Sequence, residues 1–179
     1  VVALVAAGEV WALAGGTIAH VPVASEPRRV LAERLAGVAG AVFLLDRARD
    51  AVVRSGIDAG AALSFTAPGQ DWLTSTVDLA DAIDIGADGA VYILWRDGSL
   101  ARFASGVHQP LPADEVDAES FEAAGLYVAA SADRLLVADR TNGRLLVLSK
   151  TGALLDRLAR PVQPAAADEA RRMGRFENL

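Results

Sequence analysis

The chain has 179 residues, of which 53% are hydrophobic, so it holds enough apolar material for the core of one domain of ordinary size. A formal net charge of −6 and a single lysine, Lys150, argue against the clustered basic residues that a nucleic-acid partner requires. The absence of cysteine excludes a disulfide framework and thiol chemistry, and no run reaches the roughly 20 apolar residues of a membrane span.

Four β-hairpins are predicted along the chain, because a short apolar run four times reaches a tight turn and restarts as a second apolar run. Glycine in three of the turns supplies the positive φ that short hairpin turns need. This punctuation excludes a helical solenoid. The predicted hairpins cover residues 9–21, 41–54, 90–103 and 134–148.

The spacing of the hairpins indicates the kind of repeat. The step from Val91 to Leu135 is 44 residues, that from Val42 to Val91 is 49, and that from Val10 to Val42 is 32. These steps lie around the roughly 40 to 50 residues of a propeller blade. We therefore predict an all-β chain of four β-propeller blades within residues 1–160, with approximate bounds 1–35, 36–76, 77–120 and 121–160.

Each predicted blade has an inner strand, two hairpin strands and an outer strand. Residues 91–95 and 135–138 lack apolar and polar alternation, which is typical of strands covered on both faces, as in stacked blades. Inner strands are expected at residues 82–88 and 125–133, with a shortened one near 35–40. Outer strands are expected at residues 154–160 or 29–34.

Four blades are the smallest number typical of a propeller ring. The unequal spacing and the first residue, Val1 instead of Met, favour part of a larger six-bladed ring, or a ring that is open or completed by oligomerisation. Residues 161–173 suit either a helical tail or the start of a further blade. The last three residues, Glu177 to Leu179, match the start of a protease recognition tag, so residues 174–179 are predicted to be a linker and tag remnant.

One recurrent pair of positions is a candidate binding site, because three hairpins end their first strand with a residue followed by arginine. In a propeller, equivalent positions gather at one rim, which would bind a protein or a small polar ligand. The alternative is structural: the aspartate caps the turn and pairs with a nearby arginine, worth about 0 to 1 kcal/mol at a surface. The predicted rim residues are Asp46, Arg47, Trp95, Arg96, Asp139 and Arg140.

Catalytic and metal motifs are not found. The run from Asp84 to Trp95 begins like a calcium loop, but its third position is glycine and its twelfth is tryptophan, so the coordination shell would be incomplete. Only His20 and His108 exist, too few for a multi-histidine metal site. We expect no cofactor and no resident metal.

Other polar and aromatic residues carry weaker signals. Trp72 stands in a long connection and is either a core residue or an exposed binding aromatic. Asp78, Asp81 and Asp84 form an acidic string whose default interpretation is a solvated edge. Open blade edges, with unpaired strands, also favour a homo-oligomer.

Residues 77–103, which include Ile85-Gly-Ala-Asp-Gly-Ala-Val-Tyr-Ile, and residues 136–148 resemble NHL/YVTN-type six-bladed propellers. The resemblance covers roughly residues 41–160. It is particularly close to propellers at the carboxyl end of bacterial multidomain membrane-associated proteins, some of which have a region related to metal-dependent Ser/Thr phosphatases. The resemblance implies an extracytoplasmic or membrane-associated location within a longer protein.

Two functions from different classes follow. The first is a non-catalytic sensor or scaffold propeller that binds a protein or a small polar ligand at the rim. The second is a propeller hydrolase of the lactonase kind, whose metal would be bound by carboxylates in the central channel. Asp46, Asp84 and Asp139 are the candidate ligands for that metal.

Overall fold

The structure is a computed structural model of the chain. It describes backbone and side chains for residues 34–37, 41–56, 70–111 and 121–159, and the backbone of the strands at 2–6, 9–14, 17–21, 24–25, 28–29, 38, 57–58 and 64–65. The Gly15 and Gly16 turn and the predictions for residues 161–179 lie outside the described residues.

Four antiparallel sheets follow one another in chain order, and we call them blades 1 to 4. Blade 1 has the strands β1 (Val2–Ala6), β2 (Glu9–Ala14) and β3 (Thr17–Val21). Blade 2 has β6 (Arg34–Val38), β7 (Ala41–Asp46) and β8 (Ala51–Asp58), with β9 (Ser64–Phe65) and β10 (Gln70–Asp71) both paired to β8. A short ribbon of β4 (Ala24–Ser25) and β5 (Arg28–Arg29) precedes blade 2.

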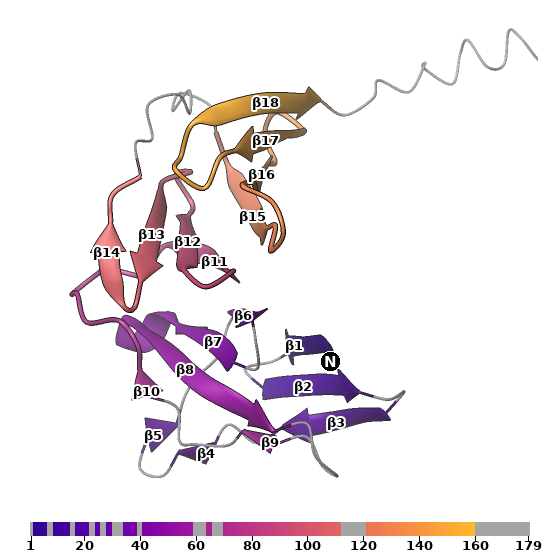
Figure 1. Ribbon diagram of the computed structural model, residues 1–179, viewed down its shortest axis with the longest axis vertical. Coiled ribbons are helices and arrows are strands. Elements are labelled where there is room, and N and C mark those ends of the chain that lie inside the picture. The colour runs from indigo at the N-terminus through magenta and orange to yellow at the C-terminus, as the bar shows by residue number, and fades with distance from the viewer. Residues whose placement is uncertain are drawn as a thin grey trace, which may run out of the picture.

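Blades 3 and 4 are four-stranded meanders. Blade 3 has β11 (Ala82–Ala87), β12 (Val91–Trp95), β13 (Leu100–Ala104) and β14 (Val107–Gln109). Blade 4 has β15 (Ala123–Val128), β16 (Leu135–Asp139), β17 (Arg144–Leu148) and β18 (Leu154–Ala159). The blades lie along an open arc, with the first strands of blades 2, 3 and 4 side by side (Figure 1).

The core lies between the blades instead of inside any one of them. One buried cluster joins blades 2 and 3 and includes Phe43, Leu45 and Ile93. A second cluster joins blades 3 and 4 and includes Tyr92 and Leu135. Neighbouring residues of β12 therefore belong to opposite clusters, which confirms the expectation that residues 91–95 form a strand covered on both faces. For residues 135–138 the expectation is wrong on one side: Leu135 and Val137 are buried against blade 3, whereas Leu136 and Ala138 are only half-buried.

The predicted hairpins are present at the expected places, but the predicted end of one inner strand is wrong. The inner strand of blade 4 ends at Val128 and not at residue 133, because the Ala129 N–H donates to the Arg134 carbonyl over 3.1 Å and closes a turn. Of the predicted outer strand 29–34, only the two end residues are described, and they belong to different strands: β5 ends at Arg29, and Arg34 begins the inner strand of blade 2. The outer strand β14 has no clear pattern in the sequence.

Among the described residues, helical structure is limited to the 3₁₀ turn η1 (Arg47–Arg49) between β7 and β8. The turn ends at Asp50, whose φ of 50° lies in the left-handed region. No helix in the described part of the chain is long and apolar enough to cross a membrane.

Candidate functional site

A pocket of about 570 Å³ opens where the hairpin turn of blade 3 meets the segment that enters blade 4. Two aromatic side chains and five charged ones form its walls. The lining residues are Asp78, Asp81, Trp95, Arg96, Asp97, Phe121 and Glu122.

The last residue of β12 fixes one wall of the pocket. Trp95 packs partly against the core between blades 2 and 3, and its indole Nε1 donates to the Asp78 carbonyl over 3.0 Å. The backbone of the next residue, Arg96, connects blade 3 with blade 4. Its N–H donates to the Asp81 carbonyl over 3.0 Å, and its carbonyl accepts the Ala123 N–H of blade 4 over 3.3 Å. The backbone beneath the pocket is therefore held at a blade junction.

The turn of blade 3, which follows Trp95 in the chain, forms a further part of the lining. Gly98 has a φ of +87°, and a Cβ atom there would lie 2.4 Å from Cδ1 of Phe121, so only glycine leaves room for this ring. Beside it, the Asp97 carboxylate accepts the Ser99 hydroxyl over 2.6 Å and the Ser99 N–H over 2.9 Å. These hydrogen bonds lower the pKa of Asp97 against the opposing effect of burial, so this carboxylate stays ionised in mild acid.

The pocket is acidic, because its lining has four carboxylates and one guanidinium. The Arg96 guanidinium lies 3.9 Å from an Asp81 oxygen, and both side chains are largely exposed, so water weakens this ion pair. A negative pocket with tryptophan and phenylalanine in its walls suits a cation with a flat apolar group, since ring faces and carboxylates both attract positive charge.

The predicted rim residues of blades 3 and 4 have different surroundings. Trp95 and Arg96 line the pocket, whereas Asp139 and Arg140 lie at the equivalent turn of blade 4. Arg140 reaches the pocket only through Glu122: its N–H donates to the Glu122 carbonyl over 2.8 Å, and its guanidinium lies 3.3 Å from the Glu122 carboxylate.

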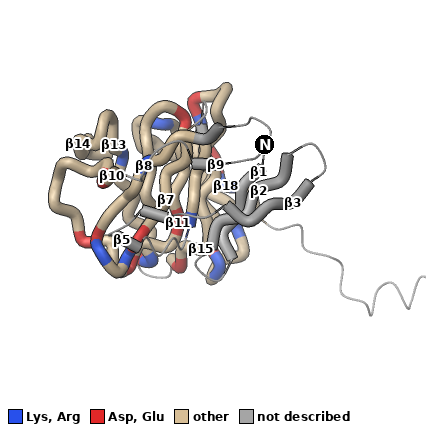
Figure 2. The backbone as a smooth tube through the Cα atoms, turned by 90° about the horizontal axis from the view of Figure 1, so that it is seen from below, with Lys and Arg blue, Asp and Glu red and all other residues tan. Residues whose placement is uncertain are grey.

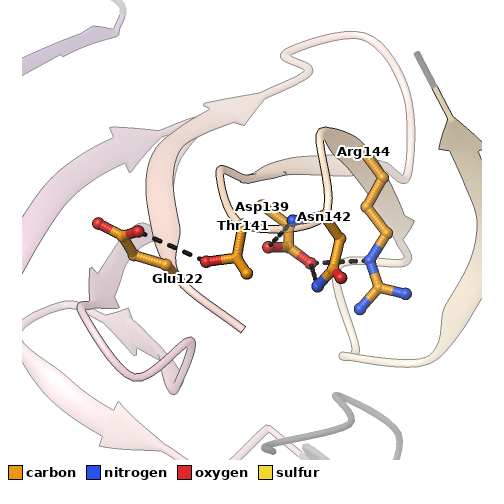
Figure 3. Close-up of polar contacts among 5 residues, drawn as sticks. All are labelled: Glu122, Asp139, Thr141, Asn142 and Arg144. Carbon is orange, nitrogen blue, oxygen red and sulfur yellow. Dashed lines mark hydrogen bonds and ion pairs between the residues drawn. The ribbon is translucent and has the colours of Figure 1, made fainter. Parts of the chain in front are cut away.

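Asp139 organises the turn of blade 4, as the structural alternative expects (Figure 3). Its buried carboxylate accepts the Asn142 N–H over 3.3 Å, the Asn142 side-chain amide over 2.7 Å and the Arg144 Nε over 2.7 Å. Burial raises the pKa of Asp139, but these hydrogen bonds outweigh it, and the net pKa lies below the ordinary value. Thr141 donates to Glu122 over 3.5 Å at the edge of the same turn.

The predicted rim residues of blade 2 do not line the pocket. Asp46 is fully buried at the end of β7 and lies 3.5 Å from the Arg49 guanidinium, which in turn lies 3.1 Å from Asp71. Arg47 begins the 3₁₀ turn. The described structure thus gathers the predicted residues of blade 3, together with Arg140 through Glu122, and leaves those of blade 2 apart.

Several lining residues have weak signals or none in the sequence. Asp78 and Asp81 belong to the acidic string whose default interpretation is a solvated edge, and only stacking of blade 4 makes them part of a pocket wall. Phe121 and Glu122 precede a strand without any motif. Trp72 is half-buried and packs on Phe43, with ring centroids 5.0 Å apart, so it is a packing residue and not an exposed binding aromatic.

The three aspartates that the metalloenzyme hypothesis names as metal ligands interact with groups of the protein instead. One Asp84 oxygen accepts the Ile85 N–H over 2.9 Å, and the other accepts the Leu126 N–H of blade 4 over 2.8 Å. Within the described residues, no three histidine, aspartate or glutamate side chains form a group that could hold a metal, and Asp46, Asp84 and Asp139 do not converge. Acidic and basic residues are interspersed along the described backbone (Figure 2).

No protein-family model and no curated protein matches this sequence. Solved propeller structures do match the fold. A streptogramin B lyase superposes with a TM-score of 0.56 at 14% identity, covering 89% of this chain and 50% of that one. A virginiamycin B lyase from Staphylococcus aureus, with quinupristin, gives 0.53 at 12% identity over 88% and 50%.

Regucalcin from Agrobacterium tumefaciens, a calcium-binding protein, gives a TM-score of 0.51 at 15% identity, covering 92% of this chain and 48% of that one. These similarities and the stacked antiparallel sheets establish a β-propeller fold. The chain spans about half the length of the solved propellers that it matches. The matched proteins include enzymes, so the fold alone does not choose between binding and catalysis.

Proposed function

We propose that this chain is a non-catalytic recognition segment of a larger propeller protein, and that it binds a small organic cation or a cationic side chain of a partner. The observation that carries this function is the acidic pocket of about 570 Å³ between blades 3 and 4, with Trp95 and Phe121 in its walls. The volume lies within the range of small-molecule sites.

The chemistry of the pocket favours binding over turnover. Two of its four carboxylates are held by neighbouring residues: Asp97 accepts two hydrogen bonds from Ser99 in the turn of blade 3, and Glu122 pairs with Arg140 of blade 4. Such groups attract a positive charge, and an aromatic ring adds about 0.5 to 2 kcal/mol when the cation lies over its face. The lining includes no histidine, cysteine or serine that could act as a nucleophile or a general base near neutral pH.

The wider setting follows the resemblance to NHL/YVTN-type propellers. In this proposal the segment acts as the sensor or scaffold part of a longer, extracytoplasmic or membrane-associated protein. The chain covers half of each of these solved propellers, and this supports a place within a longer protein.

Calorimetric titration tests the binding function with benzyltrimethylammonium as the probe and benzenesulfonate as its anionic counterpart. We expect saturable binding of the cation only. The double variant Asp97→Asn with Glu122→Gln should weaken binding about 5- to 30-fold, at about 0.5 to 1 kcal/mol per charge. The matched control Asp156→Asn removes an exposed carboxylate that does not line the pocket and should leave the affinity unchanged. Equal binding of both probes would contradict the proposal.

Thermal unfolding with Ca²⁺, Mg²⁺, Mn²⁺ and Zn²⁺, added singly, tests the metalloenzyme alternative. A metal bound at ten times its Kd would stabilise the fold by more than about 1 kcal/mol. Under the proposed function, none of the four metals gives that stabilisation.

A further inference from the structure

Among the described residues that line the acidic pocket, Arg96 is the one basic residue. Its backbone is held at the junction of blades 3 and 4 by hydrogen bonds to Asp81 and Ala123. The base of this side chain is therefore fixed beside the pocket, whereas the side chain itself is 62% exposed. A positive group at a fixed place in a negative lining distinguishes this pocket from a simple cation site.

The Arg96 guanidinium is only weakly engaged by the protein. It lies 3.9 Å from an Asp81 oxygen, and the Asp81 side chain is 79% exposed. In the turn of blade 4, by contrast, the Arg144 Nε lies 2.7 Å from the buried Asp139. A guanidinium presents a planar fork of N–H donors that fits a carboxylate with two parallel hydrogen bonds, and 3.9 Å is too long for either bond. The fork of Arg96 can therefore bind a carboxylate of a ligand at little cost to the fold.

Negative groups occupy another part of the lining. The Asp97 carboxylate accepts two hydrogen bonds from Ser99 within the hairpin turn, whereas the guanidinium of the preceding residue lies near Asp81. Asp97 is next in the chain to Gly98, and Glu122 is next to Phe121, whose ring lies against Gly98. The pocket thus presents a positive group and negative groups at separate places, with an aromatic ring beside the negative ones.

We propose that the ligand of this pocket is a small aromatic zwitterion, with an ammonium and a carboxylate on one carbon, as in an aromatic α-amino acid. This inference rests on the proposed function and narrows it, since the cationic group then belongs to a molecule that also has a carboxylate. Asp97 and Glu122 attract the ammonium, and the Arg96 guanidinium binds the carboxylate. The ligand ring packs against Trp95 and Phe121.

Calorimetric titration near neutral pH with three matched probes tests the ligand class. L-Phenylalanine has both charges, L-phenylalaninol has only the ammonium, and 3-phenylpropionate has only the carboxylate. We expect phenylalanine to bind about 5- to 10-fold more tightly than phenylalaninol, because a charge-assisted hydrogen-bond pair to arginine is added. 3-Phenylpropionate should bind most weakly, since the four carboxylates of the lining repel it.

Variants of the arginine assign the preference to its guanidinium. Arg96→Met should abolish the advantage of phenylalanine without weakening phenylalaninol, and Arg96→Lys should retain part of the advantage, because lysine keeps the charge but lacks the planar fork. The matched control Arg134→Met removes an exposed arginine of blade 4 that does not line the pocket, and it should leave all affinities unchanged.

The outcomes separate this inference from the proposed function. If phenylalaninol and benzyltrimethylammonium bind but phenylalanine binds no more tightly than phenylalaninol, the proposed function stands and the inference is overturned. Equal weakening of phenylalanine and phenylalaninol by Arg96→Met would also overturn it, because the arginine would then act on the shape of the pocket and not on the carboxylate. If benzyltrimethylammonium and the three probes all fail to bind, both proposals are wrong.

Discussion

Blades 3 and 4 have the same strand order and closely related hairpins, yet they have different surroundings. Blade 3 has a buried cluster on each face, so Ile93 and Leu94 are both fully buried although they point to opposite sides. Among the described residues, blade 4 has one such cluster, and on its other side Tyr127 and Leu145 are exposed while Val147 is buried. The comparison shows that the stability of a blade depends on its neighbouring blades, because the buried apolar clusters lie between sheets and not within one sheet.

The largest expected effect comes from truncating a leucine on the corresponding side of each of these two blades. Leu94→Ala should destabilise the chain by about 2 to 5 kcal/mol at every protein concentration, because it leaves a cavity between blades 3 and 4. Leu145→Ala should cost less than about 1 kcal/mol, because this side chain is 40% exposed. Urea unfolding of both variants measures the change in the free energy of unfolding, and equal costs would contradict the difference between the two blades.

The hairpin glycines give the next largest difference. Gly98→Ala should cost about 2 to 4 kcal/mol, because a φ of +87° strains alanine and the new Cβ would meet Phe121. Gly143→Ala at the turn of blade 4 should cost only about 1 to 2 kcal/mol, since its φ is +57° and nothing lies within 4 Å of the new Cβ. Thermal unfolding in the same buffer ranks the two variants, and the reverse order would show that the turns are not packed as described.

A smaller difference is expected between two ion pairs, one mostly buried between blades and one largely exposed. Lys150 of blade 4 pairs with Asp88 of blade 3 over 2.5 Å, and both side chains are mostly buried at 19% and 9% exposure. Lys150→Met should therefore cost about 1 to 3 kcal/mol, much of it from the aspartate left unpaired. Arg96→Met, which breaks a largely exposed pair with Asp81, should stay within about 0.5 kcal/mol. A double-mutant cycle of Lys150→Met with Asp88→Asn isolates the coupling free energy of this ion pair. A coupling free energy of zero would show that the pair does not stabilise the contact between blades 3 and 4.

The smallest effect concerns pH. Because the pKa of Asp139 is lowered in the folded state, its ionised form stabilises the fold above the ordinary aspartate pKa near about 4, and this contribution is lost as the pH falls through the lower folded value. The stability difference between the unmodified chain and Asp139→Asn should thus be constant from neutral pH to about pH 5 and shrink below about pH 4. Asp97→Asn should behave in the same direction but more weakly, because Asp97 is exposed.

The sequence predicts the repeating parts of this molecule well, and the reason is local. Turn glycines such as Gly98 and Gly143, and apolar runs such as residues 91–95, need no knowledge of distant residues to be recognised. The strand β14 escapes prediction because its residues Val-His-Gln have no apolar pattern and form a strand only by pairing with β13.

The candidate site was only partly predictable. Trp95 and Arg96 are marked by their repeated position, but the repeat also marks Asp46 and Arg47, which belong to another environment. The pocket joins the turn of blade 3 to Phe121 and Glu122 before blade 4, and this proximity arises from the packing of one blade on the next. No spacing rule within a single blade could show it.

The most direct test of the binding function is a titration of the ¹⁵N-labelled chain with benzyltrimethylammonium, followed by two-dimensional NMR. The proposed function predicts saturable shifts of the Asp97 and Glu122 amides and of the Trp95 indole N–H, with one common Kd. It also predicts that signals of residues that do not line the pocket, such as the Tyr127 amide, stay in place. Saturation without shifts at the pocket, or shifts centred on residues outside its lining, would contradict a binding site between blades 3 and 4.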